Sequence, residues 1–202
     1  MKIVIVGNAS VKTDLSNEIN SADLVVRFNI ATKNNFNINT GVKTDILCVS
    51  NISALGRAIA KYRQLLNLPF IPGLKQVWFP RPASKPAKQV WFKPWSRRKF
   101  RQADYSKFII SRNGLVDKEI VYFGDELFKE CCLTLGIAAD FGMHEPSSGF
   151  LALQYILRNF DLTEHQLLMT GFTFSGVDTH PWQKEKEEAL RLQKLGMLKL
   201  VF

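Results

Sequence analysis

A run of β-branched residues near the start of the chain restricts the fold more than any other stretch. Residues 3–6 read Ile-Val-Ile-Val, and a continuous apolar run of this kind predicts a strand that is buried on both faces. Gly7, Asn8 and Ser10 follow at once. A glycine, an amide and a hydroxyl in this position predict a tight turn that faces a phosphate group. Every later element has to be placed around this strand and its turn.

The rest of the chain alternates between strand and helix patterns. Further strands are predicted at residues 22–29, 46–49, 76–79, 119–123, 166–169 and 197–201. Helices are predicted at residues 11–20, 53–66 and 126–135, from the 146–149 segment to residue 157, and at 182–195. Strands joined through helices form parallel βαβ units, so we expect an α/β, Rossmann-like fold with a largely parallel sheet flanked by helices. The ligand crevice of such a sheet lies at the carboxyl ends of its strands.

Length and composition are typical of a single domain, which we predict to span residues 1–202. An apolar fraction of 46% is enough for one core. The longest apolar runs hold about five or six residues, well below the roughly 18 of a membrane-spanning helix, and residues 1–6 lack a signal-peptide layout. Cys48, Cys131 and Cys132 are odd in number, so neither a paired disulfide framework nor a Cys-x-x-Cys metal site is expected. These features predict a cytoplasmic, reducing location.

The net charge of +9 comes from one segment. Residues 75–112 hold eleven Lys and Arg against one acidic residue, and the rest of the chain is close to neutral. The segment also repeats an aromatic pattern, Gln76-Val77-Trp78-Phe79-Pro80 and then Gln89-Val90-Trp91-Phe92-Lys93-Pro94. Because its prolines disfavour a long helix, we predict a mobile basic and aromatic insertion at about residues 80–106. Such a segment suits a membrane interface, an anionic glycan or single-stranded nucleic acid about equally well.

Two segments hold residue types that catalysis needs. Ser147 and Ser148 precede an apolar helix, where serines cap free N–H groups and the helix terminus attracts anions. His180 lies beyond the 166–169 strand, at an edge of the sheet where a general base is expected. Glu185 either orients the imidazole or begins the charged helix. Taken one at a time, these residues are more often a helix cap and an ordinary loop histidine.

Together, the segments resemble the sialyltransferases that share the sialylmotifs, and the chain looks like a compact bacterial relative of them. Residues 4–10, 18–29 and 40–45 are similar, in order and spacing, to the large motif. Residues 146–153, with Thr170-Gly171-Phe172 downstream, resemble the small motif. His180 and Glu185, which are five residues apart, match the very small motif.

The resemblance implies an inverting transfer of a sialic-acid-type 2-keto sugar acid from its CMP ester to a hydroxyl of a surface glycan or glycolipid. His180 and Glu185 are then the catalytic candidates, with His180 as the base. The candidates for binding the CMP donor are Gly7, Asn8, Ser10, Asn29, Ser147, Ser148, Gly149, Gly171 and Phe172. The candidates for contact with the acceptor or a membrane are Trp91, Trp95, Arg97, Arg98 and Lys99. The chain contains no Asp-x-Asp pair and the family is metal-independent, so we expect no metal ion and no cofactor besides the CMP-sugar substrate.

The resemblance has departures and consequences for location. The two family cysteines that pair in secretory-pathway members correspond to about Ile3 and Phe160, which agrees with a reducing cytoplasm. The separate aromatic third motif, with its own histidine, is absent or merged with the His180 region. A basic insertion suits the phosphates of a glycolipid and the anionic bilayer, so a peripheral position at the inner membrane face is expected.

Several alternatives stay open. A CMP-Kdo-dependent transferase of lipopolysaccharide core or capsule would use the same motifs. A non-catalytic nucleic-acid-binding module would show steeply salt-dependent binding that does not involve His180, although nucleic acid is not the expected partner. An oxidoreductase is disfavoured because the glycine fingerprint is missing. Arg27 either has a structural role, which we favour, or contacts an anionic donor group, and Asp45 is expected to be architectural.

Overall fold

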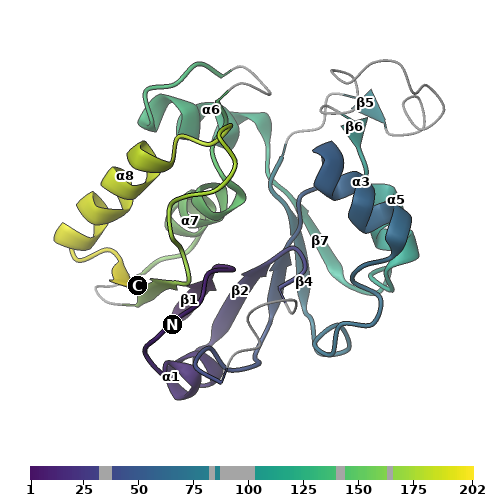
Figure 1. The fold of residues 1–202 in the computed structure, drawn as a ribbon, viewed down its shortest axis with the longest axis horizontal. Coiled ribbons are helices and arrows are strands. Elements are labelled where there is room, and N and C mark those ends of the chain that lie inside the picture. Colours follow the sequence, from purple (N-terminus) through teal and green to yellow (C-terminus); the bar gives the residue numbers. More distant parts are fainter. Residues whose placement is uncertain (32–37, 82–84, 87–102, 140–143, 163–165) are drawn as a thin grey trace.

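Seven parallel strands form the central sheet of the protein (Figure 1). The computed structural model describes residues 1–31, 38–81, 85–86, 103–139, 144–162 and 166–202. The strands lie in the order β7-β4-β3-β2-β1-β8-β9. Their bounds are Ile3–Val6 (β1), Leu24–Phe28 (β2), Ile46–Cys48 (β3), Gln76–Phe79 (β4), Glu119–Tyr122 (β7), Leu167–Thr170 (β8) and Lys199–Val201 (β9). The predicted α/β class with a parallel sheet is confirmed.

Helices cover both faces of this sheet. Three of them, α6 (Asp125–Thr134), α7 (Ser148–Asn159) and α8 (Trp182–Lys194), pack on one face. The other face carries α1 (Ser16–Asn20), α3 (Ser53–Tyr62) and α5 (Ser106–Arg112). Strand β1 is apolar throughout because both of its faces are buried. Ile3 and Ile5 belong to the core that α6, α7 and α8 cover, and Val4 and Val6 belong to the core around α1. All four side chains are buried, as predicted.

The order of the strands reverses next to β1. The chain builds the sheet outward from β1 through β2, β3, β4 and β7, and then crosses to the other side of β1 to add β8 and β9. Val6 at the end of β1 is in register with Arg27 of β2 and with Thr170 of β8. In open α/β sheets the crevice beyond the carboxyl ends at such a reversal is the preferred ligand site.

Three helices differ from the sequence predictions. Helix α1 begins five residues later than predicted, because Asn39 holds the preceding segment in a non-helical form through the carbonyls of Val11 and Lys12 and the N–H of Leu15. Helix α3 ends at Tyr62 rather than near residue 66, where Arg63 takes a left-handed conformation with φ of 50°. Helix α5 was not predicted.

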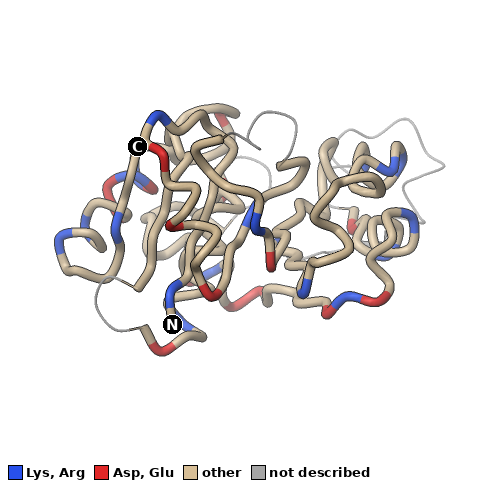
Figure 2. The backbone as a smooth tube through the Cα atoms, turned by 90° about the horizontal axis from the view of Figure 1, so that it is seen from below, with Lys and Arg blue, Asp and Glu red and all other residues tan. Residues whose placement is uncertain are grey.

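Of the predicted basic insertion, the structure describes residues 80–81, 85–86 and 103–106. Arg81 and Ala103 are buried, and Ala103–Asp104 (β6) pairs in parallel with Lys85–Pro86 (β5). Residues 82–84 and 87–102, which include the five acceptor-contact candidates, lie outside the described residues. Along the described chain, basic and acidic positions are interspersed (Figure 2). No helix in the described ranges is both long and apolar enough to cross a bilayer.

Candidate active site

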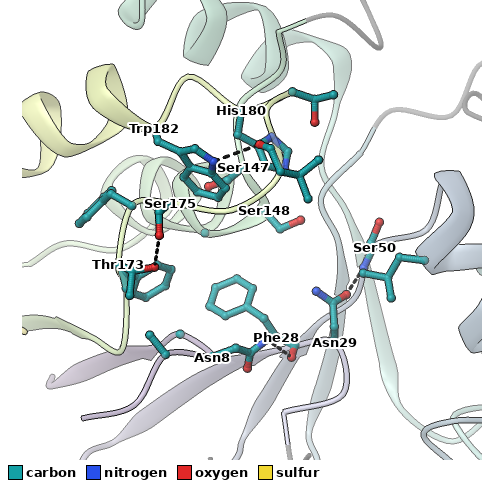
Figure 3. A pocket seen from close by; sticks show the side chains of 18 of the residues that line it. Asn8, Phe28, Asn29, Ser50, Ser147, Ser148, Thr173, Ser175, His180 and Trp182 are labelled. Carbon is teal, nitrogen blue, oxygen red and sulfur yellow. Dashed lines mark hydrogen bonds between the residues drawn. The ribbon is translucent and has the colours of Figure 1, made fainter. Parts of the chain in front are cut away.

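A cleft of about 880 Å³ lies at the carboxyl ends of β1, β2 and β8. The turn after β1, the ends of β2 and β3, the start of α7 and the loop after β8 supply its walls (Figure 3). All the donor-binding candidates line it: Gly7, Asn8, Ser10, Asn29, Ser147, Ser148, Gly149, Gly171 and Phe172. His180 also lines the cleft, whereas Glu185 lies behind the wall. Residues from six distant parts of the sequence therefore meet in one place.

Two glycines allow the turns after β1 and β8 to pack backbone to backbone. A Cβ atom on Gly7 would lie 2.2 Å from the carbonyl oxygen of Gly171, which is not a position any side chain can occupy. Gly171 itself has a φ of 72°, in the left-handed region that favours glycine. Hydrogen bonds from Gly7 N to Thr170 O and from Ala9 N to Gly171 O, at 2.8 and 2.9 Å, join the turns.

Asn8 and Asn29 lie on the wall formed by the ends of β1 and β2 (Figure 3). Asn8 donates from Nδ2 to the carbonyl oxygen of Phe28 at 3.3 Å, which is a long hydrogen bond. Asn29 has a φ of 52°, and its Oδ1 accepts from the N–H of Ser50 at 2.8 Å. With the oxygen engaged, the amide nitrogen of Asn29 is the group available to a ligand.

The start of α7 is held by a carboxylate from α8. Glu185 accepts hydrogen bonds from Ser147 N and Ser147 Oγ, both at 2.6 Å. The same Oγ accepts from the N–H of Phe150 at 3.1 Å and so caps the helix. The hydroxyl hydrogen of Ser147 is thereby used within the protein. The first four N–H groups at this helix end are those of residues 147–150, and those of Ser147 and Phe150 are bound within the protein. The N–H groups of Ser148 and Gly149 are left to bind an anion.

Gly149 and Phe172 shape the wall beside this helix end. A Cβ atom on Gly149 would lie 2.5 Å from Cε1 of the Phe172 ring. The ring in turn contacts Phe28 edge to face, with centroids 5.8 Å apart. The absent side chain at Gly149 therefore lets an aromatic ring close against the helix start.

His180 is oriented by a backbone carbonyl. Its Nδ1 lies 2.8 Å from the carbonyl oxygen of Glu145, which can only accept, so Nδ1 carries the proton and Nε2 is the basic nitrogen of the neutral ring. The imidazole also contacts Trp182 edge to face at 4.9 Å. Burial lowers the pKa of His180, the bond to Glu145 opposes this, and the charge of Arg81 adds to the lowering. The net lowering of the pKa favours the neutral, proton-accepting form of the ring.

The sequence left open whether Glu185 orients the imidazole or begins the charged helix, and the structure places it in the first turn of α8, in contact with Ser147. Its side chain is 2% exposed and holds Ser147, while Glu145 takes the position beside the imidazole. Burial raises the pKa of Glu185, and the two hydrogen bonds from Ser147 act in the opposite direction. Glu185 is therefore a support of the helix start and not a partner of His180 Nδ1.

Arg27 has the structural role that we favoured. It donates from Nη2 to the carbonyl oxygens of Thr40 and Gly41, at 2.7 and 3.0 Å, and from Nε to that of Lys43 at 3.1 Å. Burial lowers its pKa to about 10. Asp45 has an architectural role, because its Oδ2 accepts a hydrogen bond from Val25 N at 3.0 Å and its Oδ1 forms an ion pair with Lys75 at 2.8 Å.

Two residues of the site were missed in the sequence. Glu145 precedes the small motif, and Arg81 follows β4, where it pairs with Glu145 at 2.6 Å. Arg81 carried a usable signal, because it comes directly after a strand and a proline and so lies at the carboxyl edge of the sheet. Glu145 carried none, because its main contribution is a carbonyl group. Among the residues that the structure describes, no cluster of His, Cys, Asp and Glu is arranged to hold a metal ion.

The fold and the cleft are those of an α/β protein with a ligand crevice at the carboxyl ends of its strands, where a helix start and an imidazole line the same cleft. The sequence matches the profile of glycosyltransferase family 29 (sialyltransferase) over residues 2–189, so the chain belongs to this family. It is accordingly a CMP-sugar-dependent glycosyltransferase that transfers sialic acid. The resemblance inferred from the motifs is confirmed.

Two crystal structures of a mammalian sialyltransferase are similar to the protein. One, in complex with Gal-beta-1-3GalNAc-ortho-nitrophenol, has a TM-score of 0.56. The other has a TM-score of 0.61. Each is 15% identical in sequence, and the match covers 98% of this chain and 68% of the mammalian one. At this identity the similarity establishes the fold. A comparison with curated protein sequences gives no match.

Proposed function

We propose that the protein is an inverting sialyltransferase in which His180 removes the proton from an acceptor hydroxyl while CMP leaves from the opposite face of the sugar. The observation that carries the proposal is the fixed tautomer of His180. Its Nδ1 is occupied by the Glu145 carbonyl, so Nε2 is available as a base in the cleft that holds the donor-binding candidates. A well-placed base contributes on the order of 10²–10⁴ in rate.

The start of α7 supplies the site for the donor phosphate. The free N–H groups of Ser148 and Gly149 and the side chain of Ser148 lie at the positive end of a twelve-residue helix. Among the described residues of the cleft lining, Arg81 is the sole lysine or arginine, and it is already paired with Glu145. Neutral donors, including the Asn8 and Asn29 amides, therefore have to carry the stabilisation of the leaving phosphate.

The carboxylates of the cleft favour a single displacement. A retaining mechanism needs a nucleophile that forms a covalent sugar intermediate. Within the described lining, Glu145 has the sole carboxylate, and Arg81 holds its Oε2 at 2.6 Å. With no free carboxylate in this part of the lining, direct attack by the acceptor hydroxyl is the chemistry that the residues support, and it inverts the anomeric centre.

The decisive experiment compares His180→Asn with His144→Asn. Asparagine at position 180 can still donate to the Glu145 carbonyl but cannot act as a base, and His144 is an exposed histidine outside the cleft lining. Transfer from CMP-sialic acid to a galactoside is followed by mass spectrometry, with CMP-Kdo as the competing donor, and CMP binding by calorimetry. We expect His180→Asn to lose about 10²-fold or more in turnover with CMP affinity retained, and His144→Asn to behave as wild type.

Two outcomes would contradict the proposal. Wild-type turnover in His180→Asn would exclude His180 as the base. A product whose NMR couplings show the anomeric configuration of the donor would exclude inversion. The nature of the acceptor, a surface glycan or glycolipid of a bacterium, and the role of the basic insertion at a membrane are proposed from the sequence alone, because the insertion lies outside the described residues.

A further inference from the structure

An ion pair between a buried arginine and a partly buried glutamate lies next to the proposed base. Arg81 follows β4 and is 5% exposed, and its Nη1 donates to Glu145 Oε2 at 2.6 Å. The two residues are 64 positions apart in the sequence. Neither belongs to the motifs by which the family is recognised in this chain. A buried pair of this kind is a weak argument for stability alone, because desolvation opposes the attraction.

Arg81 is fixed in place by its backbone as well as by its side chain. Its N–H donates to Asn51 Oδ1 at 3.2 Å, and its carbonyl oxygen accepts from Asn51 Nδ2 at 3.0 Å. Asn51 is completely buried and also donates to Asp104 at 3.1 Å. The guanidinium is therefore presented from a rigid point between the ends of β3 and β4.

Glu145 connects this rigid point to the base through three groups. Its side chain receives Arg81, its N–H donates to the carbonyl oxygen of Thr179 at 2.9 Å, and its carbonyl oxygen accepts from His180 Nδ1 at 2.8 Å. The segment before α7 and the loop that carries His180 are thereby tied to each other and to β4. A shift of Glu145 would move the carbonyl group that accepts a hydrogen bond from the imidazole.

The charges around the imidazole come from three elements. Arg81 after β4 and Glu145 before α7 both act on His180, with opposite signs. Glu185 of α8 is buried nearby, acts on Arg81 and is engaged with Ser147. His144 and Asp178 are exposed to solvent. Removing either member of the Arg81–Glu145 pair therefore leaves an unbalanced charge next to the ring.

We propose that the Arg81–Glu145 ion pair positions His180 for proton removal and balances the charge beside it, so that Arg81 is a positioning residue of the transfer reaction. The inference rests on the proposed function of His180. It predicts that replacing Arg81 and replacing Glu145 shift the pKa of His180 in opposite directions, which a pair that served only the fold would not do. Without Arg81, the Glu145 carboxylate stabilises the imidazolium; without the Glu145 charge, the Arg81 cation disfavours it.

The test uses Arg81→Met, Glu145→Gln and the double variant in the full chain. The acid limb of the kcat profile should move to higher pH in Arg81→Met, to lower pH in Glu145→Gln and close to wild type in the double variant. In Arg81→Met, kcat should also fall by about 10-fold or more through misplacement of the base, with the KM for the donor and CMP affinity unchanged. Arg158→Met is the matched control, because it breaks an exposed pair with Glu130 at 2.9 Å outside the cleft lining.

An activity-independent measurement separates this inference from the proposed function. The imidazole of His180, one of three histidines, is titrated by NMR in each folded variant, with His180→Asn giving the assignment. Opposite shifts of its pKa in the two single variants support the inference even if no transfer is found. Shifts in the same direction, no shift, or equal losses of kcat and CMP affinity would overturn it. If Arg81→Met does not fold, Glu145→Gln and its shift to lower pH decide alone.

Discussion

Replacement of Glu185 by alanine should loosen the start of α7. The substitution removes two charge-assisted hydrogen bonds and leaves the N–H and the hydroxyl of Ser147 in a buried position without this acceptor. Each such bond contributes about 1.5–3 kcal/mol, so the gross loss is about 3–6 kcal/mol. Relief from burying a carboxylate offsets part of this, and we expect a net loss of about 2–4 kcal/mol in the free energy of unfolding.

The loss is measured by urea unfolding and by calorimetry. For a chain of this size each kcal/mol lowers Tm by about 2–4 °C, so the expected decrease is roughly 4–16 °C. Glu185→Gln is the matched variant, because its amide oxygen can still accept from Ser147 N, and it should retain about half of the stabilisation. A free energy of unfolding for Glu185→Ala within about 0.5 kcal/mol of wild type, the scatter expected for a surface substitution, would refute the proposed support of the helix start.

The same residue predicts a dependence on pH. Burial raises the pKa of Glu185 in the folded protein, so over the interval between its unfolded and folded pKa values the folded state binds more protons than the unfolded chain. The contribution of Glu185 to stability therefore falls as the pH rises from the ordinary glutamate pKa through the raised one, and is constant above it. Wild type should lose stability relative to Glu185→Gln across that interval. A constant difference would show that burial does not perturb this carboxyl group.

Three further substitutions separate effects on CMP binding from effects on folding. Gly149→Ala should weaken CMP binding with little change in Tm, because the new methyl group displaces the ring of Phe172 into the cleft. Gly7→Ala should prevent folding or lower Tm sharply, because its methyl group meets the Gly171 backbone. Thermal melting measures Tm and calorimetry measures CMP binding for both variants, and equal effects of the two substitutions on Tm would contradict the reasoning. Asn8→Ala should reduce CMP affinity by more than its effect on stability, since its hydrogen bond to Phe28 is long at 3.3 Å, and a loss of stability with unchanged CMP affinity would show that Asn8 serves the fold alone.

The sequence predicts the sheet and the position of the cleft for a physical reason. Strands such as β1 and β8 are buried on both faces, so β1 is apolar throughout and β8 is apolar up to its last residue, Thr170. Since the polar residues that follow parallel strands meet at one edge, Gly7, Asn29 and Gly171 could be assigned to one site before any coordinates. The helix boundaries were less predictable, because α1 is shortened by Asn39, whose contacts are made 27 and 28 residues away.

The contacts that support the site could not be predicted in the same way. Glu185 bonds to a serine 38 residues earlier, and Glu145 bonds to Arg81 across 64 residues. No periodicity connects such positions, and the spacing of His180 and Glu185 left open whether Glu185 orients the imidazole or begins the charged helix. The group that orients His180 is a main-chain carbonyl, which any residue at position 145 would provide, so the residue type alone cannot reveal it.

Glu185 and Glu145 therefore support different parts of the site, and experiment can separate the two roles. Glu185 stabilises the helix end that faces the donor phosphate, so its replacement should change stability and CMP affinity together. Glu145 supports the base, so the loss of its charge should change the pH dependence of turnover and leave CMP affinity intact. If both variants changed the same observable, the helix start and the base would depend on each other structurally. Glu185 contacts Ser147, whereas Glu145 contacts Arg81 and His180. These separate contacts favour two independent supports.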